Sequence, residues 1–173
     1  MTDRRSFLRG SSVLLGSAAL GNVLQAFAAE PRKATTFTAL EMTALRAVVD
    51  VILPETDSPA ASAAGTHYFI DLAIPACATP AARRTFRAGL AELVNSRFAS
   101  KSPVEQVSWL KAVAAADMKL GYEQSFFKIL KDYTLTGYFL SETGATRALA
   151  YDKIPGGYWG DVPLEPGQKA WTL

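Results

Sequence analysis

The sequence contains a single cysteine, Cys77, and a single histidine, His67. One cysteine cannot close an internal disulfide bond, so we expect packing alone to hold the fold together. Cys77 is expected to be a small buried apolar side chain, with a bond to a partner protein or to a metal ion as the alternatives. One imidazole without a thiolate or a second histidine makes a poor transition-metal site. We therefore expect His67 to lie at the surface or to cap a helix, rather than to act in catalysis or to bind haem.

The usual cofactor motifs are also missing. The chain has no Cys-x-x-Cys-His motif for covalent haem, no Gly-x-Gly-x-x-Gly turn, no phosphate-binding loop and no zinc pattern. Of the carboxylates, Glu55 and Asp57 lie close together in sequence, but their proline-rich stretch is typical of a solvated turn. Ser141 begins a helix-entry pattern and not a nucleophile elbow. The sequence predicts no catalytic, cofactor-binding or metal-binding residue in this chain.

Charge is absent from residues 10–29. The segment before this run is a twin-arginine export pattern, formed by Arg4, Arg5, Phe7 and Leu8. Ala26 and Ala28 supply a small-x-small cleavage site. We therefore predict that residues 1–28 are a signal peptide of the twin-arginine route, which carries folded proteins to the periplasm. An uncleaved membrane anchor is the alternative, although serine, glycine and alanine dilute the apolar run.

An excess of basic charge is missing from the rest of the chain. The whole sequence has 18 basic and 16 acidic residues, and the predicted signal peptide holds three arginines and one aspartate, which leaves 15 of each sign in residues 29–173. Zero net charge argues against nucleic-acid binding, which needs a basic surface. Removing 28 residues from 173 leaves 145. This length is that of one domain, and the apolar content suffices for a single core.

Strand-like alternation is almost absent too. Apolar residues at helical spacing instead run through residues 37–150, in four long patterns and one shorter one. The first opens with a capping box at Thr38 and stops at Pro54. The short pattern covers residues 65–74 and stops at Pro75. These signals predict an all-α fold, a small helical bundle.

Three longer patterns complete the predicted bundle. Thr79 begins one and Ser102 begins the next, which runs to residue 120, because each hydroxyl precedes a proline and can cap a helix. The last long pattern begins near Tyr122 and is interrupted at Gly137. A brief helical turn over residues 142–150 is expected to follow.

Helical periodicity ends at Tyr151. Residues 151–173 are rich in glycine, proline and aromatic residues, and we predict that they form an extended C-terminal arm. Tyrosine and tryptophan are enriched where proteins meet. Five aromatic residues are our candidates for contact with another chain: Tyr133, Tyr138, Phe139, Tyr158 and Trp159. The alternative is that the arm folds back over its own bundle.

Three blocks of the sequence resemble the gluconate 2-dehydrogenase subunit 3 family. ILPETDSP at 52–59, followed by an Ala-Gly pair at 64–65, is similar to the family signature IPxTDTPGAxxAG. LTGYFLSE at 135–142 resembles the stretch TLxGYFTSE, and YDKIPGGY at 151–158 resembles the closing segment YxPxPGxYxGC. With its leader, the chain resembles the family over nearly its whole length. It departs at Asp161, where members often have a cysteine, so a disulfide at that point is not available.

The resemblance implies that the chain is a small, non-catalytic subunit of a periplasmic dehydrogenase complex. Its partner would be a large FAD-binding subunit of the glucose–methanol–choline oxidoreductase type. That subunit would oxidise a sugar, sugar acid, glycoside or polyol and pass electrons to a c-type cytochrome. The present chain would help it to fold, stabilise it and export it through the twin-arginine translocase. Two other functions stay open at this point: an enzyme or electron carrier in its own right, and a free-standing periplasmic binding or structural protein.

Overall fold

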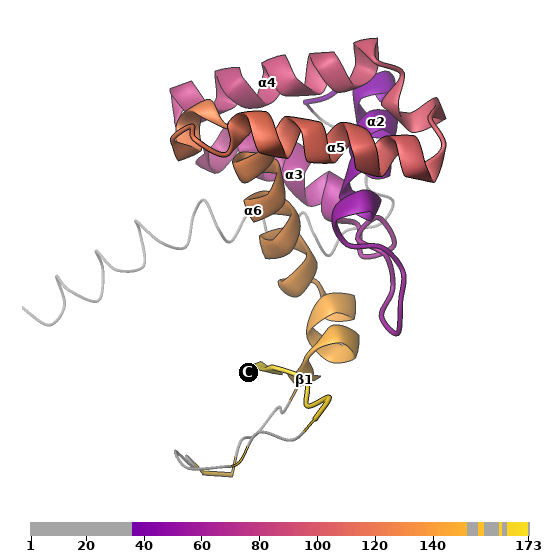
Figure 1. The fold of residues 1–173 in the computed structure, drawn as a ribbon. Coiled ribbons are helices and arrows are strands. Elements are labelled where there is room, and N and C mark those ends of the chain that lie inside the picture. Colours follow the sequence, from indigo (N-terminus) through magenta and orange to yellow (C-terminus); the bar gives the residue numbers. More distant parts are fainter. Residues whose placement is uncertain (1–35, 152–155, 158–162, 164–165, 173) are drawn as a thin grey trace, which may run out of the picture.

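The computed structural model describes residues 36–151, 156–157, 163 and 166–172 (Figure 1). Its long helices are α2 (Ala39–Ile52), α3 (Thr66–Cys77), α4 (Pro80–Asn95), α5 (Pro103–Asp117) and α6 (Phe126–Phe139). Its shorter elements are the 3-10 turns η1 (Phe98–Ser100) and η2 (Tyr122–Gln124), the π-type turn η3 (Gly144–Ala148), and the strands β1 (Ala150–Tyr151) and β2 (Trp171–Thr172). The described part is mostly helical, with only two short strands, which confirms the predicted all-α fold.

Local capping bonds start α2, α4 and α5 where the sequence predicts them. The Thr38 hydroxyl accepts a hydrogen bond from the amide of Glu41, whose carboxylate in turn accepts one from the Thr38 amide at 2.8 Å. Ser102 and Glu105 form the same reciprocal box at the start of α5. At α4, the Thr79 hydroxyl caps the amide of Ala82. Each box pairs amides that would otherwise lack a partner in the first helical turn.

The two helices α2 and α6 lie at the centre of the bundle. Each of them contacts α3, α4 and α5, and they also contact each other. The core is made of large apolar side chains that are completely buried, among them Leu45, Val48, Ile70, Phe86, Leu90, Leu93, Ile129 and Leu130. Their helical spacing accounts for this burial, because it gathers them on the inner face of each helix. The predicted small bundle is therefore the observed architecture.

Two predicted helix breaks are wrong. Proline does not end α3 at residue 75, because Pro75 lies in the last turn and costs only one hydrogen bond there. The amide of Ala78 still donates to the carbonyl of Ile74, and the guanidinium of Arg83 donates to the Pro75 carbonyl at 3.2 Å. Helix α6 likewise continues through Gly137 to its end at residue 139.

Glycine at two helical positions lets aromatic rings approach the backbone. A Cβ atom at Gly137 would lie 2.5 Å from Cδ1 of Phe69 on α3, and one at Gly89 of α4 would lie 2.2 Å from Cγ of Phe126. Both glycines are buried. Gly137 therefore serves close packing between α3 and α6 instead of interrupting a helix.

The start of α6 also differs from the prediction. Tyr122 lies in the separate turn η2 and is exposed, and α6 begins only at Phe126 with Ser125 as its cap. The carboxylate of Asp117 accepts hydrogen bonds from the Ser125 hydroxyl and from the amide of Phe127, both at 2.9 Å. Asp117 is also the last residue of α5, which ends three residues before the predicted position. The tight α5–α6 connection is thus held by the Asp117 carboxylate, together with the Lys128 ammonium, which donates to the Leu120 carbonyl at 2.6 Å.

Candidate partner-binding surface

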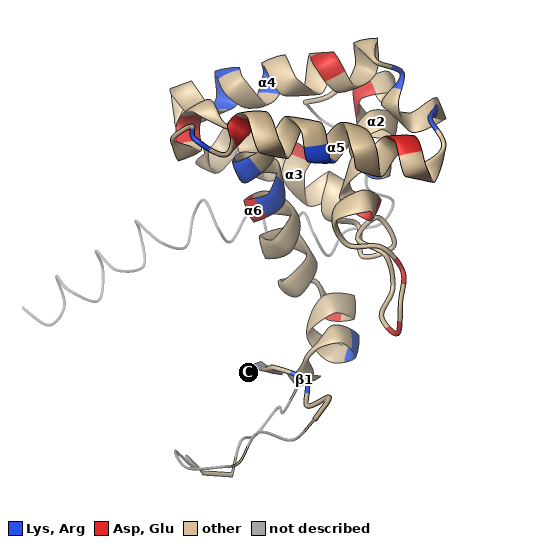
Figure 2. Cartoon of the chain, in the orientation of Figure 1, with Lys and Arg blue, Asp and Glu red and all other residues tan. Residues whose placement is uncertain are grey.

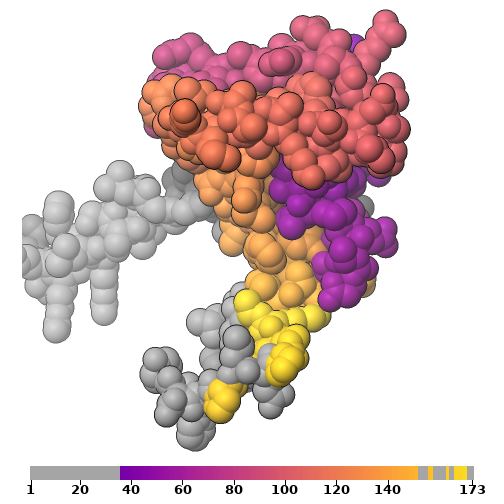
Figure 3. All heavy atoms as spheres, in the orientation of Figure 1, coloured from indigo at the N-terminus to yellow at the C-terminus, as the bar shows by residue number. Residues whose placement is uncertain are grey.

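Two of the three sequence blocks singled out above meet at one end of the molecule. The phenol of Tyr138, on the last turn of α6, donates a hydrogen bond to the carbonyl of Pro59 at 2.8 Å. Pro59 belongs to the loop between α2 and α3, 79 residues earlier in the chain. We call this part of the molecule the distal end. It lies at the lower end of α6 and protrudes below the bundle (Figures 1 and 3).

The distal end exposes three large apolar side chains, which we call the distal surface. They are Phe139 at 37%, Leu140 at 56% and Tyr151 at 48% of full exposure. No charged residue occurs between Asp132 and Glu142, so the lower half of α6 is uncharged (Figure 2). Protein interfaces are depleted of charge at their centre and enriched in aromatic residues. The distal surface has this composition.

A tight turn after α6 directs the chain from the bundle toward the arm. The hydroxyl of Ser141 donates to the Tyr138 carbonyl at 2.6 Å and accepts a hydrogen bond from the amide of Gly144 at 2.9 Å. A Cβ atom at Gly144 would lie 1.9 Å from the Tyr138 carbonyl oxygen, so only glycine fits there. The Ser141 hydroxyl thus caps the next helical turn, as the sequence predicts, and Tyr151 follows the end of that turn by three residues.

The end of the arm returns to its beginning. Strands β1 and β2 pair in parallel, with Ala150 opposite Trp171, and the Ala150 amide donates to the Ala170 carbonyl at 2.8 Å. The described arm residues, 156–157, 163 and 166–170, are all exposed. Within this described part, the arm therefore offers its surface to solvent and not to the bundle. Tyr158 and Trp159, two of the predicted partner contacts, lie outside the described residues.

The other three predicted partner contacts have different surroundings. Phe139 is on the distal surface, whereas Tyr138 is only 2% exposed and packs edge-on against the Phe139 ring. Tyr138 serves the fold through its bond to Pro59 and leaves almost no surface for a partner. Tyr133 is half-buried, and its burial, together with nearby Cys77 and Asp132, raises the pKa of its phenol.

Sequence reasoning missed Leu140 and Tyr151 as members of the distal surface. Leu140 follows Tyr133 by seven residues and so lies on the same side of α6. The uncharged run from 133 to 141 was the signal that could have included it. The predicted export residues, Arg4, Arg5, Phe7 and Leu8, and the cleavage residues Ala26 and Ala28 lie outside the described residues.

The single cysteine and the single histidine both differ from the predictions. Cys77 is exposed, because it is the last residue of α3 and lies beyond the bundle core. His67 is buried near the start of α3, where its ring lies 4.2 Å from that of Tyr68. Within the described residues, no group of three or more histidine, cysteine, aspartate or glutamate side chains could hold a metal ion.

The carboxylates lie apart from one another, and several of them accept hydrogen bonds from backbone amides. Asp50 accepts a hydrogen bond from the amide of Ser62 at 2.7 Å, and buried Asp71 accepts two, from the amides of Thr36 and Phe37 at 3.0 and 2.8 Å. Glu55 and Asp57 are exposed near the tip of the α2–α3 loop, as expected for a solvated turn. No helix in the described part of the chain is long and apolar enough to cross a membrane.

Comparison with known families now adds to this geometry. The model for the family described as gluconate 2-dehydrogenase subunit 3 matches residues 39–156. The chain belongs to this family. Comparison with curated proteins and with solved structures gave no significant match. The family match runs from the start of α2 past Tyr151, so it includes the whole bundle and the whole distal surface of this subunit 3 protein. A member of this family is an accessory subunit of a dehydrogenase complex, so it needs a surface for other subunits.

Proposed function

We propose that this chain is a non-catalytic subunit that binds the large FAD-containing subunit of a sugar or sugar-acid dehydrogenase through its distal surface. Membership of the gluconate 2-dehydrogenase subunit 3 family is the observation that carries the proposal. The uncharged lower half of α6, with Phe139 and Leu140 exposed, supports the choice of surface. An uncharged surface with exposed aromatic and aliphatic side chains has the composition of a protein interface.

The flavin and the reaction belong to the partner in this proposal. The partner is a flavoprotein of the glucose–methanol–choline type, and it passes electrons to a c-type cytochrome. The small subunit helps the flavoprotein to fold and keeps it stable. Its twin-arginine leader then takes both proteins, already folded together, to the periplasm. This division of work is supported by the leader pattern at Arg4 and Arg5, since that route accepts folded cargo.

The first test is purification of the tagged chain from the periplasm of its own host. We expect a large protein to co-elute, with the absorption spectrum of FAD and with dye-linked dehydrogenase activity. A lone, colourless chain under gentle conditions would contradict the proposal and favour a free-standing periplasmic protein. Turnover or a visible spectrum of the isolated chain would favour an enzyme or electron carrier instead.

The second test separates export from binding. Replacing Arg4 and Arg5 together by lysine is expected to leave both subunits in the cytoplasm, still bound to each other. Arg9→Lys is the matched control, since Arg9 lies in the same leader but outside the pair, and we expect it to leave export intact. If the large subunit reached the periplasm without the arginine pair, joint export would be wrong.

A further inference from the structure

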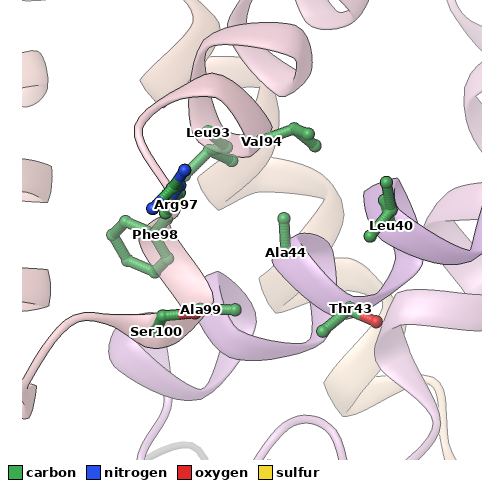
Figure 4. A pocket seen from close by; sticks show the side chains of 9 residues that line it. All are labelled: Leu40, Thr43, Ala44, Leu93, Val94, Arg97, Phe98, Ala99 and Ser100. Atoms are coloured by element: carbon green, nitrogen blue, oxygen red, sulfur yellow. The ribbon is translucent and has the colours of Figure 1, made fainter.

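A hollow of about 160 Å³ lies between the start of α2 and the end of α4 (Figure 4). It is lined by Leu40, Thr43, Ala44, Leu93, Val94, Arg97, Phe98, Ala99 and Ser100. A cavity of about 150 Å³ with an apolar lining can take up a benzene ring. The hollow therefore has room for one large apolar side chain.

The walls of the hollow are held in place before anything binds. Phe98 is completely buried, and its ring packs edge-on against Trp109 at 5.2 Å. The side-chain amide of Gln106 donates to the Phe98 carbonyl at 3.1 Å and fixes the short turn η1. Ala44, at the floor, is buried on α2. A preformed pocket loses little conformational entropy when a partner enters it.

Arg97 at the rim has an unusual backbone conformation. Its φ of 53° and ψ of 40° are left-handed, and no other non-glycine residue in the described part of the chain has a positive φ. The position follows the end of α4, where a left-handed residue is usually glycine, because a Cβ atom is strained there. Arginine at this place therefore costs stability that glycine would not.

Binding of a partner by the side chain of Arg97 would offset this cost. It is exposed, and it forms no hydrogen bond or ion pair with the residues that the structure describes. Figure 4 shows it on one side of the hollow, opposite Leu40, with Ala44 between them. Leu40 is itself 72% exposed. The site thus combines an apolar pocket, an exposed apolar rim and an unpaired cation.

We propose that this hollow is an anchor site for a protein segment that carries a large apolar side chain next to a carboxylate. The apolar side chain fills the space above Ala44, and the carboxylate pairs with the guanidinium of Arg97. Pockets that combine an apolar anchor with arginine dominate the energetics of many interfaces. The segment belongs to the dehydrogenase's large subunit, so this inference rests on the proposed function for its partner.

The anchor site would be a second contact, separate from the distal surface. Leu40 lies in the first turn of α2, whereas the loop that carries Pro59 follows the last turn. With 1.5 Å of rise per residue, the two ends of α2 are roughly 20 Å apart. A partner that reached both ends would hold the small subunit at two points.

The decisive variant is Arg97→Gly, because a binding role and a stabilising role of Arg97 predict opposite changes in melting temperature. Glycine relieves the left-handed strain, so we expect the melting temperature to rise by about 3 °C. We expect the complex with the flavoprotein to dissociate about tenfold more readily on dilution, with a weaker dependence on salt. Arg84→Ala, an exposed arginine of α4 with ordinary helical geometry, is the control and should leave the complex unchanged.

A second variant fills the hollow without changing charge. Ala44→Leu is expected to weaken the complex about tenfold by occupying the anchor space, and circular dichroism reports whether the variant folds. If the Arg97→Gly and Ala44→Leu variants both dissociate from the flavoprotein only as readily as the wild-type chain does, the anchor-site proposal is wrong. If those variants bind normally while changes at Phe139 and Leu140 abolish binding, only the anchor proposal fails. If the wild-type chain binds no flavoprotein, the proposed function is wrong, and the anchor site, which rests on it, is wrong too.

Discussion

The core of the bundle and the distal end use their large apolar side chains in opposite ways. In the bundle, the apolar side chains of α2, α4 and α6 that face the core are at most 9% exposed. At the distal surface, Phe139, Leu140 and Tyr151 stay between 37% and 56% exposed. Full burial of such a side chain is worth about 1.5–3 kcal/mol. Burial in the core contributes that free energy to folding, whereas in the proposed function the distal surface contributes it to binding of the partner.

This difference predicts which changes in sequence should affect the stability of the chain and which should affect its assembly with a partner. Core changes should lower the free energy of unfolding of the isolated chain. Changes at the distal surface should leave that quantity unchanged and should weaken the complex.

Gly89→Ala should lower the free energy of unfolding by about 2–3 kcal/mol, although alanine favours helix by about 1 kcal/mol. The added Cβ atom would lie 2.2 Å from Cγ of the buried Phe126 ring. Urea denaturation measures the effect. The adjacent exposed residue gives the control, since Ala88→Gly should lose about 1 kcal/mol from helix propensity alone. Wild-type stability in Gly89→Ala would mean that the bundle tolerates an extra methyl at this contact.

The double change of Phe139 and Leu140 to serine should weaken the complex with the large subunit roughly thirtyfold, about 2 kcal/mol. Both side chains are exposed, so the free energy of unfolding of the isolated chain should change by only about 0.5 kcal/mol. Binding is measured by dissociation of the purified complex on dilution. Leu120→Ser, which removes an apolar side chain with 41% exposure away from the distal end, is the matched control and should bind normally.

Tyr138→Phe tests the joint between the two regions. It removes the 2.8 Å hydrogen bond to the Pro59 carbonyl and keeps the ring, so a loss of about 1 kcal/mol in unfolding free energy is expected. Hydrogen exchange of the amides in residues 54–62 should become faster at the same time. Unchanged exchange would show that the loop is held by other contacts.

The smallest expected effect is a pH dependence at Tyr122. Partial burial, followed by its hydrogen bond to Asp132, raises the pKa of this phenol above its usual value of 10. The folded chain therefore holds the proton more tightly than the unfolded chain does. This contribution is fully present below pH 10 and is lost as the pH rises through the folded pKa. Urea unfolding between pH 9 and 11 should show a fall in stability that is shallower in Tyr122→Phe. Identical slopes would contradict the assignment.

The starts of α2, α4 and α5 could be predicted from the sequence because their causes are local. The capping boxes at Thr38 and Ser102 join residues three positions apart, so both partners of each interaction can be recognised in a short stretch of sequence. The cap at Ser141 is equally local. The family resemblance could be stated for the same reason, since its blocks are continuous stretches.

Errors occurred where the deciding contact comes from another element. Gly137 continues a helix because a Phe69 ring from α3 lies against it, and sequence spacing does not contain that contact. Tyr138 was predicted to face a partner, yet its phenol reaches a loop 79 residues away. The hollow beside Arg97 also depends on residues from two helices and a turn.

The sequence by itself determined the helices, their caps, the uncharged stretch at 133–141 and membership of a dehydrogenase subunit family. These features depend on neighbours within a few positions, or on continuous stretches of sequence. The tertiary structure alone decided which aromatic residues are buried, that Cys77 is exposed and His67 is not, and that a strained arginine borders a pocket. Burial and pocket shape arise from contacts between distant segments, and only the packed fold specifies those contacts.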